Sequence, residues 1–429
     1  MTWLTRYRVR EFVRTSFWLF PSLAILAAWL IGKSIVWFVP DPAWPRFDNA
    51  DIDGMRTSIA TFASSMLTFV VYAVSALLLA VQLASGQITP RLIRITFSRW
   101  QMKASTSLFV FSFGITLVAL ANLTEDTRHA MLLVTALFSN IASILMFFWF
   151  VQEVGLGLRP VAILQSIFAT GRTALDAVYP RTLDDTVAQA ADAGELTAGS
   201  GRIVRRIGPS GTFLAFGSDA LVELAIRHQG TIELITQVGE FVSTGDALAR
   251  VYPPEAAIDE QAINERVAFG AERTLQQDPL FAFRIMVDVA ARALSPAIND
   301  PTTAVLAIDQ IHRLLRYAGA KNLDNGRVLG RDGRLRLTFP TPDWEDIVDL
   351  AMTEIRLYGA TSIQVARRLR AMLEHLIDRV PPVRVAALRR ELELLERSVS
   401  RSFADPEDRR RANTGDFQGL GGSSSRVDA

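Results

Sequence analysis

The sequence predicts a membrane α-helical protein with four transmembrane helices, followed by an α+β cytoplasmic region that holds a small barrel-sandwich-like β module and further helices. Three observations predict this fold. Half of the 429 residues are hydrophobic, and the first third holds four apolar segments long enough to cross a bilayer core of ~30 Å as helices. Period-two alternation and glycine-bounded turns follow near the middle of the chain. Amphipathic helical patterns fill most of the rest.

The four apolar segments are residues 16–39, 60–84, 104–121 and 131–151. The loops between them alternate in charge. Arginines precede the first segment and follow the second, whereas aspartates dominate the loop after the first. Because positively charged loops stay in the cytoplasm, we expect both termini to be cytoplasmic and the 40–59 loop to lie outside.

A polar stripe runs along the second segment. Its members recur at three- and four-residue spacing and so share one helical face: Thr61, Ser64, Ser65, Thr68, Tyr72, Ser75 and Gln82. Unpaired hydroxyl groups are costly in lipid, so this face should meet another helix or water. One interpretation is helix packing against hydroxyl and amide side chains of the third and fourth segments. The other is the wall of a polar pathway, which so thin a bundle would form only between subunits of a homo-oligomer.

Shifts in composition divide the chain into regions. We expect a transmembrane domain at 1–158, juxtamembrane helices within 159–200, the β module at 201–254, a mainly helical cytoplasmic domain at 255–404 and a disordered tail at 405–429. The juxtamembrane helices are expected at 161–177 and 183–193. The tail is charged and then rich in glycine and serine, which disfavours a packed core.

The β module is predicted from a hairpin pattern. Residues 239–248 run Gly-Glu-Phe-Val-Ser-Thr-Gly-Asp-Ala-Leu, which resembles the closing hairpin of biotinyl and lipoyl domains. Those domains carry their cofactor on a lysine, and no lysine occurs between Lys103 and Lys321. We therefore expect an unmodified barrel, with Gly245 at positive φ in its turn.

Helical patterns dominate the region after the β module. We expect helices at 258–274, 279–294, 301–318, 342–358, 361–379 and 382–403, and a β-hairpin over 327–339. Arg284, Asp288 and Arg292 recur every four residues. Such an ion row usually forms a solvated face that contributes little to stability.

The connection before the 301–318 helix is a candidate ligand site. Asp300 directly precedes Pro301, an order typical of an N-cap and a first helical residue, so one interpretation is purely structural. The alternative is an anion or ligand site, because free amides at a helix N-terminus attract negative groups. Its candidate residues are Arg273, Arg292, Asn299, Asp300, Thr302 and Thr303.

Several classes of chemistry lack support in the sequence. There are no cysteines, which excludes disulfides, thiol catalysis and cysteine-ligated metals. The four histidines are scattered without metal-ligand spacing, and no phosphate-binding glycine motif stands between a strand and a helix. The net charge of +1 gives no field that would attract nucleic acid. We expect no enzyme activity, no cofactor, no metal and no nucleic-acid partner, and the lipid bilayer is the expected partner.

A family resemblance is carried by four blocks that follow one another along the chain. They are the turn at 86–91, the hairpin at 239–248, Glu272-Arg273-Thr274 with Gln277-Asp278, and residues 292–304. Together they resemble the predicted bacterial membrane proteins of domain of unknown function 2254, over residues 10–401. The resemblance implies a multi-pass protein of the bacterial inner membrane with a cytoplasmic domain, and it brings no activity with it.

Two functions therefore stay open. One is an oligomeric channel or transporter with a cytoplasmic regulatory domain. The other is a membrane-anchored binding or scaffolding protein without transport activity. An anchor needs neither four helices nor a hydroxyl stripe, which favours the first.

Overall fold

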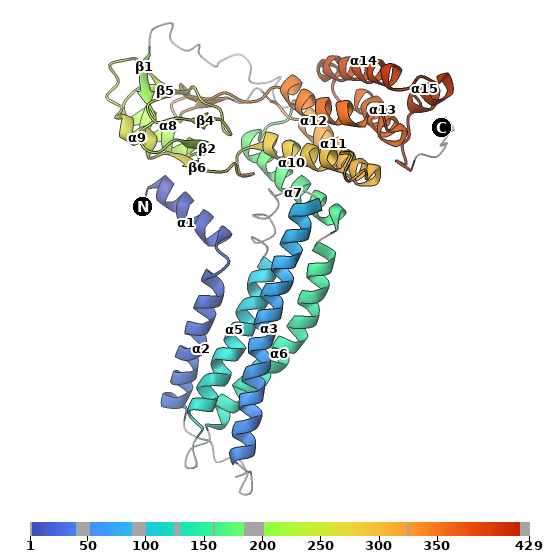
Figure 1. The fold of residues 1–429 in the computed structure, drawn as a ribbon. Coiled ribbons are helices and arrows are strands. Elements are labelled where there is room, and N and C mark those ends of the chain that lie inside the picture. Colours follow the sequence, from blue (N-terminus) through green and yellow to red (C-terminus); the bar gives the residue numbers. More distant parts are fainter. Residues whose placement is uncertain are drawn as a thin grey trace. The chain divides into compact units, whose positions relative to one another are not determined.

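The computed structural model of the chain describes residues 2–39, 52–87, 100–123, 129–157, 159–183, 201–323 and 326–420. The chain forms two compact units. One is Val9–Arg159, and the other combines Met1–Arg8 with Pro160–Ala429 (Figure 1). The predicted helix at 183–193 and the predicted turn at 86–91 lie largely outside the described residues.

The first unit is a helical bundle. Its helices are α2 (Leu19–Phe38), α3 (Ile52–Gln87), α5 (Trp100–Ala121) and α6 (Ala130–Gly157), and most of α1 (Trp3–Thr15) belongs to it as well. The four longer helices are long and apolar enough to cross a membrane, which confirms the four predicted spans. α5 packs against α2, α3 and α6, which lie around it (Figure 1).

Small residues allow α2 and α5 to approach closely. Gly114 of α5 faces Ala28 of α2, and a Cβ atom on Gly114 would lie 2.9 Å from the Ala28 Cβ. Gly32 of α2 faces Val118 of α5 in the same way, at 2.7 Å. Close backbone contact of this kind is how helices associate in lipid, where no hydrophobic effect drives them together. The α2–α5 pair is thus specified by its glycines and alanines.

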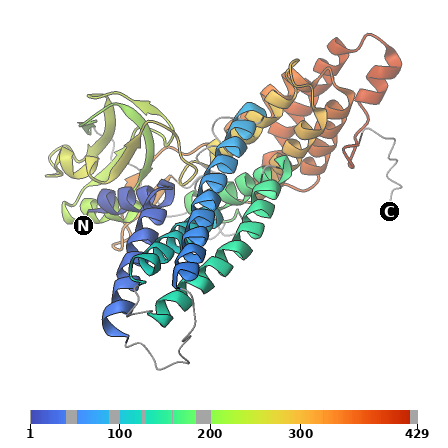
Figure 2. The same ribbon diagram turned by 60° about the horizontal axis from the view of Figure 1, so that its bottom comes forward.

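The β module holds two sheets. The strands are β1 (Arg202–Arg205), β2 (Gly211–Phe216), β3 (Thr231–Leu234), β4 (Phe241–Val242), β5 (Ala247–Tyr252), β6 (Val267–Gly270), β7 (Arg327–Leu329) and β8 (Leu335–Thr338). One sheet has the order β1-β5-β3-β8-β7, and the other has the order β4-β2-β6. Residues of both sheets, among them Val204, Phe213 and Leu337, share one buried core with α8 (Ser218–Arg227). Figure 2 shows the strands curving around this interior.

Pairing between distant segments corrects two predictions for this region. The predicted helix at 258–274 is wrong, because only α9 (Glu260–Asn264) is helical and β6 then pairs antiparallel with β2. The predicted 327–339 hairpin exists as β7 and β8, but it does not stand apart. Its β8 strand pairs in parallel with β3 and so completes the larger sheet. The β module therefore takes strands from beyond residue 254.

Gly245 has φ +90°, which confirms the positive φ predicted for that turn. Gly239, at the start of the same hairpin, has φ +99°. Both values fall where only glycine is accommodated without strain.

The rest of the second unit is helical. Its helices are α7 (Pro160–Val178), α10 (Pro279–Ala293), α11 (Pro301–Gly319), α12 (Trp344–Gly359), α13 (Ile363–Ile377), the short 3-10 helix Pro382–Arg384, α14 (Val385–Ser402) and α15 (Pro406–Ala412). Side chains of Asp278, Asp300 and Asp343 cap α10, α11 and α12 by accepting backbone N–H groups. Such caps satisfy amides that a helix leaves free at its start.

The prediction of a disordered tail from residue 405 is wrong up to residue 420. Asp405 caps α15, and the segment after it packs on α13. Asp416 is buried, and its backbone N–H donates to the Arg367 carbonyl at 3.1 Å. The Gln364 amide donates to the Gly419 carbonyl at 2.7 Å. These tertiary contacts order a segment whose composition alone predicts disorder.

The beginning of α1 belongs to the second unit. Trp3, Leu4 and Tyr7 pack on a patch that β2 and β6 form with Leu214, Ala215 and Ala268. A Cβ atom at Gly217 would lie 2.8 Å from the Trp3 ring, so a glycine is required there.

Candidate functional site

Every member of the predicted polar stripe is exposed on α3. These side chains are Thr61, Ser64, Ser65, Thr68, Tyr72, Ser75 and Gln82. The opposite face of α3 carries Ala63, Met66, Ala73, Leu77 and Ala80, each at most 4% exposed. The packed helices of one chain thus cover the apolar face and leave the polar face uncovered.

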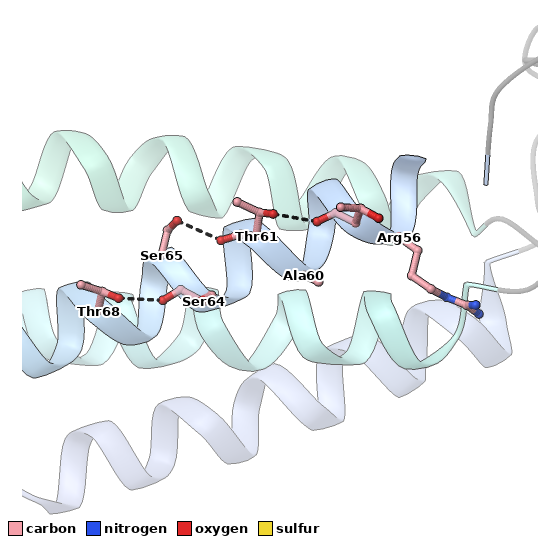
Figure 3. Close-up of a pocket in the computed structure, with 7 residues that line it drawn as sticks. Arg56, Ala60, Thr61, Ser64, Ser65 and Thr68 are labelled. Carbon is pink, nitrogen blue, oxygen red and sulfur yellow. Dashed lines mark hydrogen bonds between the residues drawn. The ribbon is translucent and has the colours of Figure 1, made fainter. Parts of the chain in front are cut away.

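Three hydroxyl groups of the stripe donate to the backbone of α3 itself. Thr61 donates to the Thr57 carbonyl at 2.8 Å, Ser65 to the Thr61 carbonyl at 2.9 Å, and Thr68 to the Ser64 carbonyl at 3.0 Å (Figure 3). A hydroxyl that donates to the preceding turn keeps its oxygen lone pairs for an outside donor or cation. At these three residues the face therefore offers acceptors whose own protons are already satisfied.

An open groove of about 550 Å³ follows the first half of this face. It is lined by Arg56, Thr57, Ala60, Thr61, Ser64, Ser65 and Thr68, all on α3 (Figure 3). Arg56 lies at one end and donates through Nη2 to the Leu123 carbonyl at 3.2 Å. The groove therefore combines hydroxyl acceptors with a guanidinium at its end.

Sequence reasoning missed Arg56 as a member of this face. Residues 56, 60, 64 and 68 share one face at four-residue spacing, so the signal was present. It was missed because the helix was expected to begin at residue 60, whereas α3 begins at Ile52. Arg56 was therefore assigned to the loop.

The polar side chains of α5 and α6 do not cover the stripe. Asn140 of α6 donates to Thr116 Oγ1 of α5 at 2.9 Å. Ser105, Ser112 and Ser143 are fully buried within the bundle. Their hydroxyl groups have no hydrogen-bond partner among the described residues. Tyr72 is the member of the stripe that packs on α6, with its ring 5.4 Å from the Phe147 ring. The packing interpretation therefore accounts for Tyr72, and the threonine and serine side chains of the stripe stay exposed.

The second candidate site is a tight helix connection. Asp300 accepts the Thr303 N–H at 3.0 Å and the Thr303 hydroxyl at 2.5 Å, while its own N–H donates to the Ala293 carbonyl at 2.7 Å. Asn299 has φ +47°, and Thr302 is exposed beside it. The Asp300 carboxylate already occupies the position that an anion would take at the start of α11. The geometry of this connection thus supports its structural interpretation as a helix cap.

Arg273 does not lie with the other candidate anion ligands. Its guanidinium pairs with Asp278 at 2.7 Å, at the beginning of α10, whereas Arg292 stands in the last turn of that helix. A helix of this length separates its ends by roughly 20 Å. Burial raises the pKa of Asp278, and the hydrogen bond from Arg273 opposes that shift. Arg273 therefore serves the cap of α10.

The structure also brings together two histidines that are far apart in sequence. His312 Nε2 of α11 lies 2.8 Å from His375 Nδ1 of α13. Burial, helped by the nearby Arg368 guanidinium and by His375, lowers the pKa of His312 to about 4. Sixty-three residues separate the pair, and no spacing rule could have found it. Among the described residues, no group of three or more His, Cys, Asp or Glu side chains is placed to hold a metal ion.

Comparison with known proteins agrees with this architecture. The chain is 26% identical to uncharacterized proteins of Mycobacterium tuberculosis (Rv1290c) and Mycobacterium bovis (Mb1321c), over 94% of this chain and 80% of each relative. No solved structure matches the chain. The family model described as a predicted membrane protein, DUF2254, matches residues 14–375. With four helices able to cross a membrane and a family match over most of its length, the chain belongs to the DUF2254 family of predicted membrane proteins.

Proposed function

We propose that the protein is an oligomeric channel or transporter of the bacterial inner membrane, in which the polar faces of α3 from several subunits line the pathway. In this proposal both termini are cytoplasmic, and the second unit is a regulatory domain. The observation that carries it is the stripe on α3, whose members the other described helices of the same chain leave exposed.

The physical argument rests on what can cover such a face. Lipid offers no hydrogen-bond donors to the free lone pairs of these hydroxyl oxygens. Water or a passing ion can use those of Thr61, Ser65 and Thr68 without breaking any bond inside the protein, because these hydroxyl protons are already bound to the α3 backbone. A second subunit placed against the α3 face would enclose the groove and turn it into a path.

The alternative is a membrane-anchored binding or scaffolding protein. The same backbone bonds favour it, because a hydroxyl that donates to its own helix is tolerated next to lipid more readily than one with a free proton. In that case the helices only hold the second unit at the membrane.

Thr68→Leu and Ser75→Leu separate these functions. Leucine on the pathway wall would narrow and dry it, and apolar constrictions gate channels by dewetting. The matched control is Thr135→Leu, because Thr135 also donates to its own helix, at 2.7 Å to the Met131 carbonyl, but belongs to α6. We expect liposomes with purified wild-type protein and with the control to pass monovalent ions, and liposomes with either α3 variant to pass far fewer.

Protein mass in detergent is measured in parallel. An oligomer whose mass is unchanged by Thr68→Leu, together with lost flux, supports the pathway. A monomeric wild-type protein, or wild-type liposomes that pass no sodium, potassium or chloride, would overturn the proposal and favour the anchored module. Equal flux through Thr68→Leu, Ser75→Leu and the control would also overturn it.

A further inference from the structure

A second cavity in the bundle lies on another side of α3 and has a different character. It measures about 440 Å³ and is mostly apolar. Its walls include Met55, Ile59 and Phe62 of α3, Leu133 and Leu137 of α6, and the side chain of Asn140. Ligand pockets in proteins are typically ~300–1,000 Å³, apolar and equipped with a few polar groups that fix orientation.

Asn140 supplies such a polar group. It is only 3% exposed, and its Nδ2 donates to Thr116 Oγ1 at 2.9 Å and to the Ala136 carbonyl at 2.7 Å. Its Oδ1 is buried and has no hydrogen-bond partner among the described residues. A residue that lines the cavity therefore holds one strong acceptor that is left unsatisfied.

The orientation of this amide follows from its neighbours. The Ala136 carbonyl can only accept, so the atom beside it must be the amide nitrogen. Thr116 already donates its hydroxyl proton to the Ser112 carbonyl at 2.6 Å, so it also needs a donor from Asn140. Both contacts place the oxygen, rather than the nitrogen, at the unpaired position.

The depth of Asn140 limits what can reach it. It lies roughly 15 Å along α6 from Ala130, at the rise of ~1.5 Å per residue in a helix. Where a ~30 Å bilayer core begins at the start of α6, Asn140 lies about halfway across it, far from the lipid headgroups. A hydrogen-bond donor that reaches Asn140 must therefore belong to a largely apolar molecule.

We infer that this cavity binds an apolar, membrane-dissolved compound that carries one hydroxyl or N–H group, with Asn140 Oδ1 as the acceptor for that donor. The apolar walls from α3 and α6 hold its body. The Asn140–Thr116 bond holds the acceptor in place. This inference does not depend on the pathway along the polar face of α3.

A pair of photoreactive probes tests the donor directly. One is hexadecanol with a diazirine in its chain, and the other is the methyl ether of the same molecule, which lacks the donor. Purified full-length protein in nanodiscs is irradiated with each probe, and labelled peptides are identified by mass spectrometry. We expect the alcohol to label peptides holding residues 54–62 and 133–140 about fivefold more than the ether, the preference that one net hydrogen bond provides.

Two variants assign the preference to this cavity. Asn140→Leu removes the acceptor, so alcohol and ether should label equally. Leu137→Trp places a bulky ring at the cavity wall, and Leu145→Trp is its matched control, because Leu145 is an exposed leucine of the same helix that does not line the cavity. We expect Leu137→Trp to lose most of the labelling and Leu145→Trp to keep it.

Each contrary outcome overturns the inference. Equal labelling of the wild-type protein by both probes would show that no donor is recognised there, and this comparison needs no variant. A preference that survives in Asn140→Leu would exclude Asn140 as the acceptor. Labelling that Leu137→Trp leaves intact, or that both tryptophan variants abolish, would place the bound probe outside the cavity.

Discussion

Arg284 of α10 donates two hydrogen bonds to the carboxylate of Glu354 on α12, at 2.5 and 2.6 Å. Arg284 also bonds Asp288, one turn along its own helix. The ion row predicted to be a solvated face is in fact a link between two helices. A bidentate pair of this kind is geometrically specific, although Glu354 is 41% exposed and solvent screens it.

The first prediction concerns this pair. The hydrogen bond from Arg284 lowers the pKa of Glu354, so the pair stabilises the fold above the unfolded pKa of glutamate and is lost as the pH falls through the lower folded pKa. We expect Glu354→Gln to lower stability by about 0.5–1 kcal/mol at neutral pH and to reduce the further loss of stability at acidic pH. Thermal unfolding across acidic pH measures both. Asp349→Asn, which breaks the exposed pair with Arg390, should lower stability less than Glu354→Gln does. Equal losses of stability in the two variants would contradict the larger contribution expected of the Arg284–Glu354 pair.

The second prediction concerns His312. Its pKa of about 4 lies below the ordinary value of 6.5, so the unfolded state takes up a proton first as the pH falls. Stability should therefore decrease between pH ~6.5 and ~4, by up to about 1.4 kcal/mol per pH unit. His312→Gln should remove this slope, whatever it does to stability at neutral pH. His228→Gln is the control and should keep the slope; an unchanged slope in His312→Gln would show that other groups cause it.

The third prediction concerns the start of α11. Asp300→Ala should cost about 1 kcal/mol, because the Thr303 N–H loses its cap. Asp300→Asn should cost much less, since asparagine caps equally well. The midpoints of thermal unfolding of the two variants and the wild type measure this difference. If Asp300→Ala instead creates stabilisation by added phosphate that the wild type lacks, the carboxylate itself blocks an anion site.

The fourth prediction compares two glycines of one hairpin. Gly239→Ala would bring its Cβ against the Arg273 guanidinium and to 2.8 Å from Asp278 Oδ2. It should therefore displace Arg273, the ion-pair partner of the Asp278 carboxylate, which is only 3% exposed. Gly245→Ala meets no atom within 4 Å and should suffer only from its positive φ, at about 1–2 kcal/mol. We expect Gly239→Ala to be clearly the more destabilising in thermal unfolding. The reverse order would contradict the role of Gly239 beneath Arg273.

The fifth prediction concerns orientation. The chain contains no cysteine, so single cysteines introduced by Asn49→Cys and Ser98→Cys give unambiguous labelling. An impermeant thiol reagent should label intact cells at position 49 only, and position 98 after permeabilisation. Labelling of intact cells at position 98 would invert the proposed topology.

Features encoded by neighbouring residues were predictable. The spans follow from hydropathy, the start of α11 from Asp300 beside Pro301, and the turn conformation from Gly245. Features that depend on distant partners were not. Val267 and Ala268 form a strand because β2 offers them an edge, and Asp416 is buried because α13 lies beneath it. The polar face of α3 could be read from spacing, but its exposure required knowing which face the other helices cover.

The first residues of α1 bear on how the second unit can be produced in isolation. Trp3, Leu4 and Tyr7 lie on Leu214, Ala215 and Ala268, more than two hundred residues away in the chain. A recombinant fragment that starts at Pro160 would leave this patch bare and prone to aggregation. The second unit is in this sense a two-fragment assembly, and a synthetic peptide spanning the first eight residues would be its complementing piece.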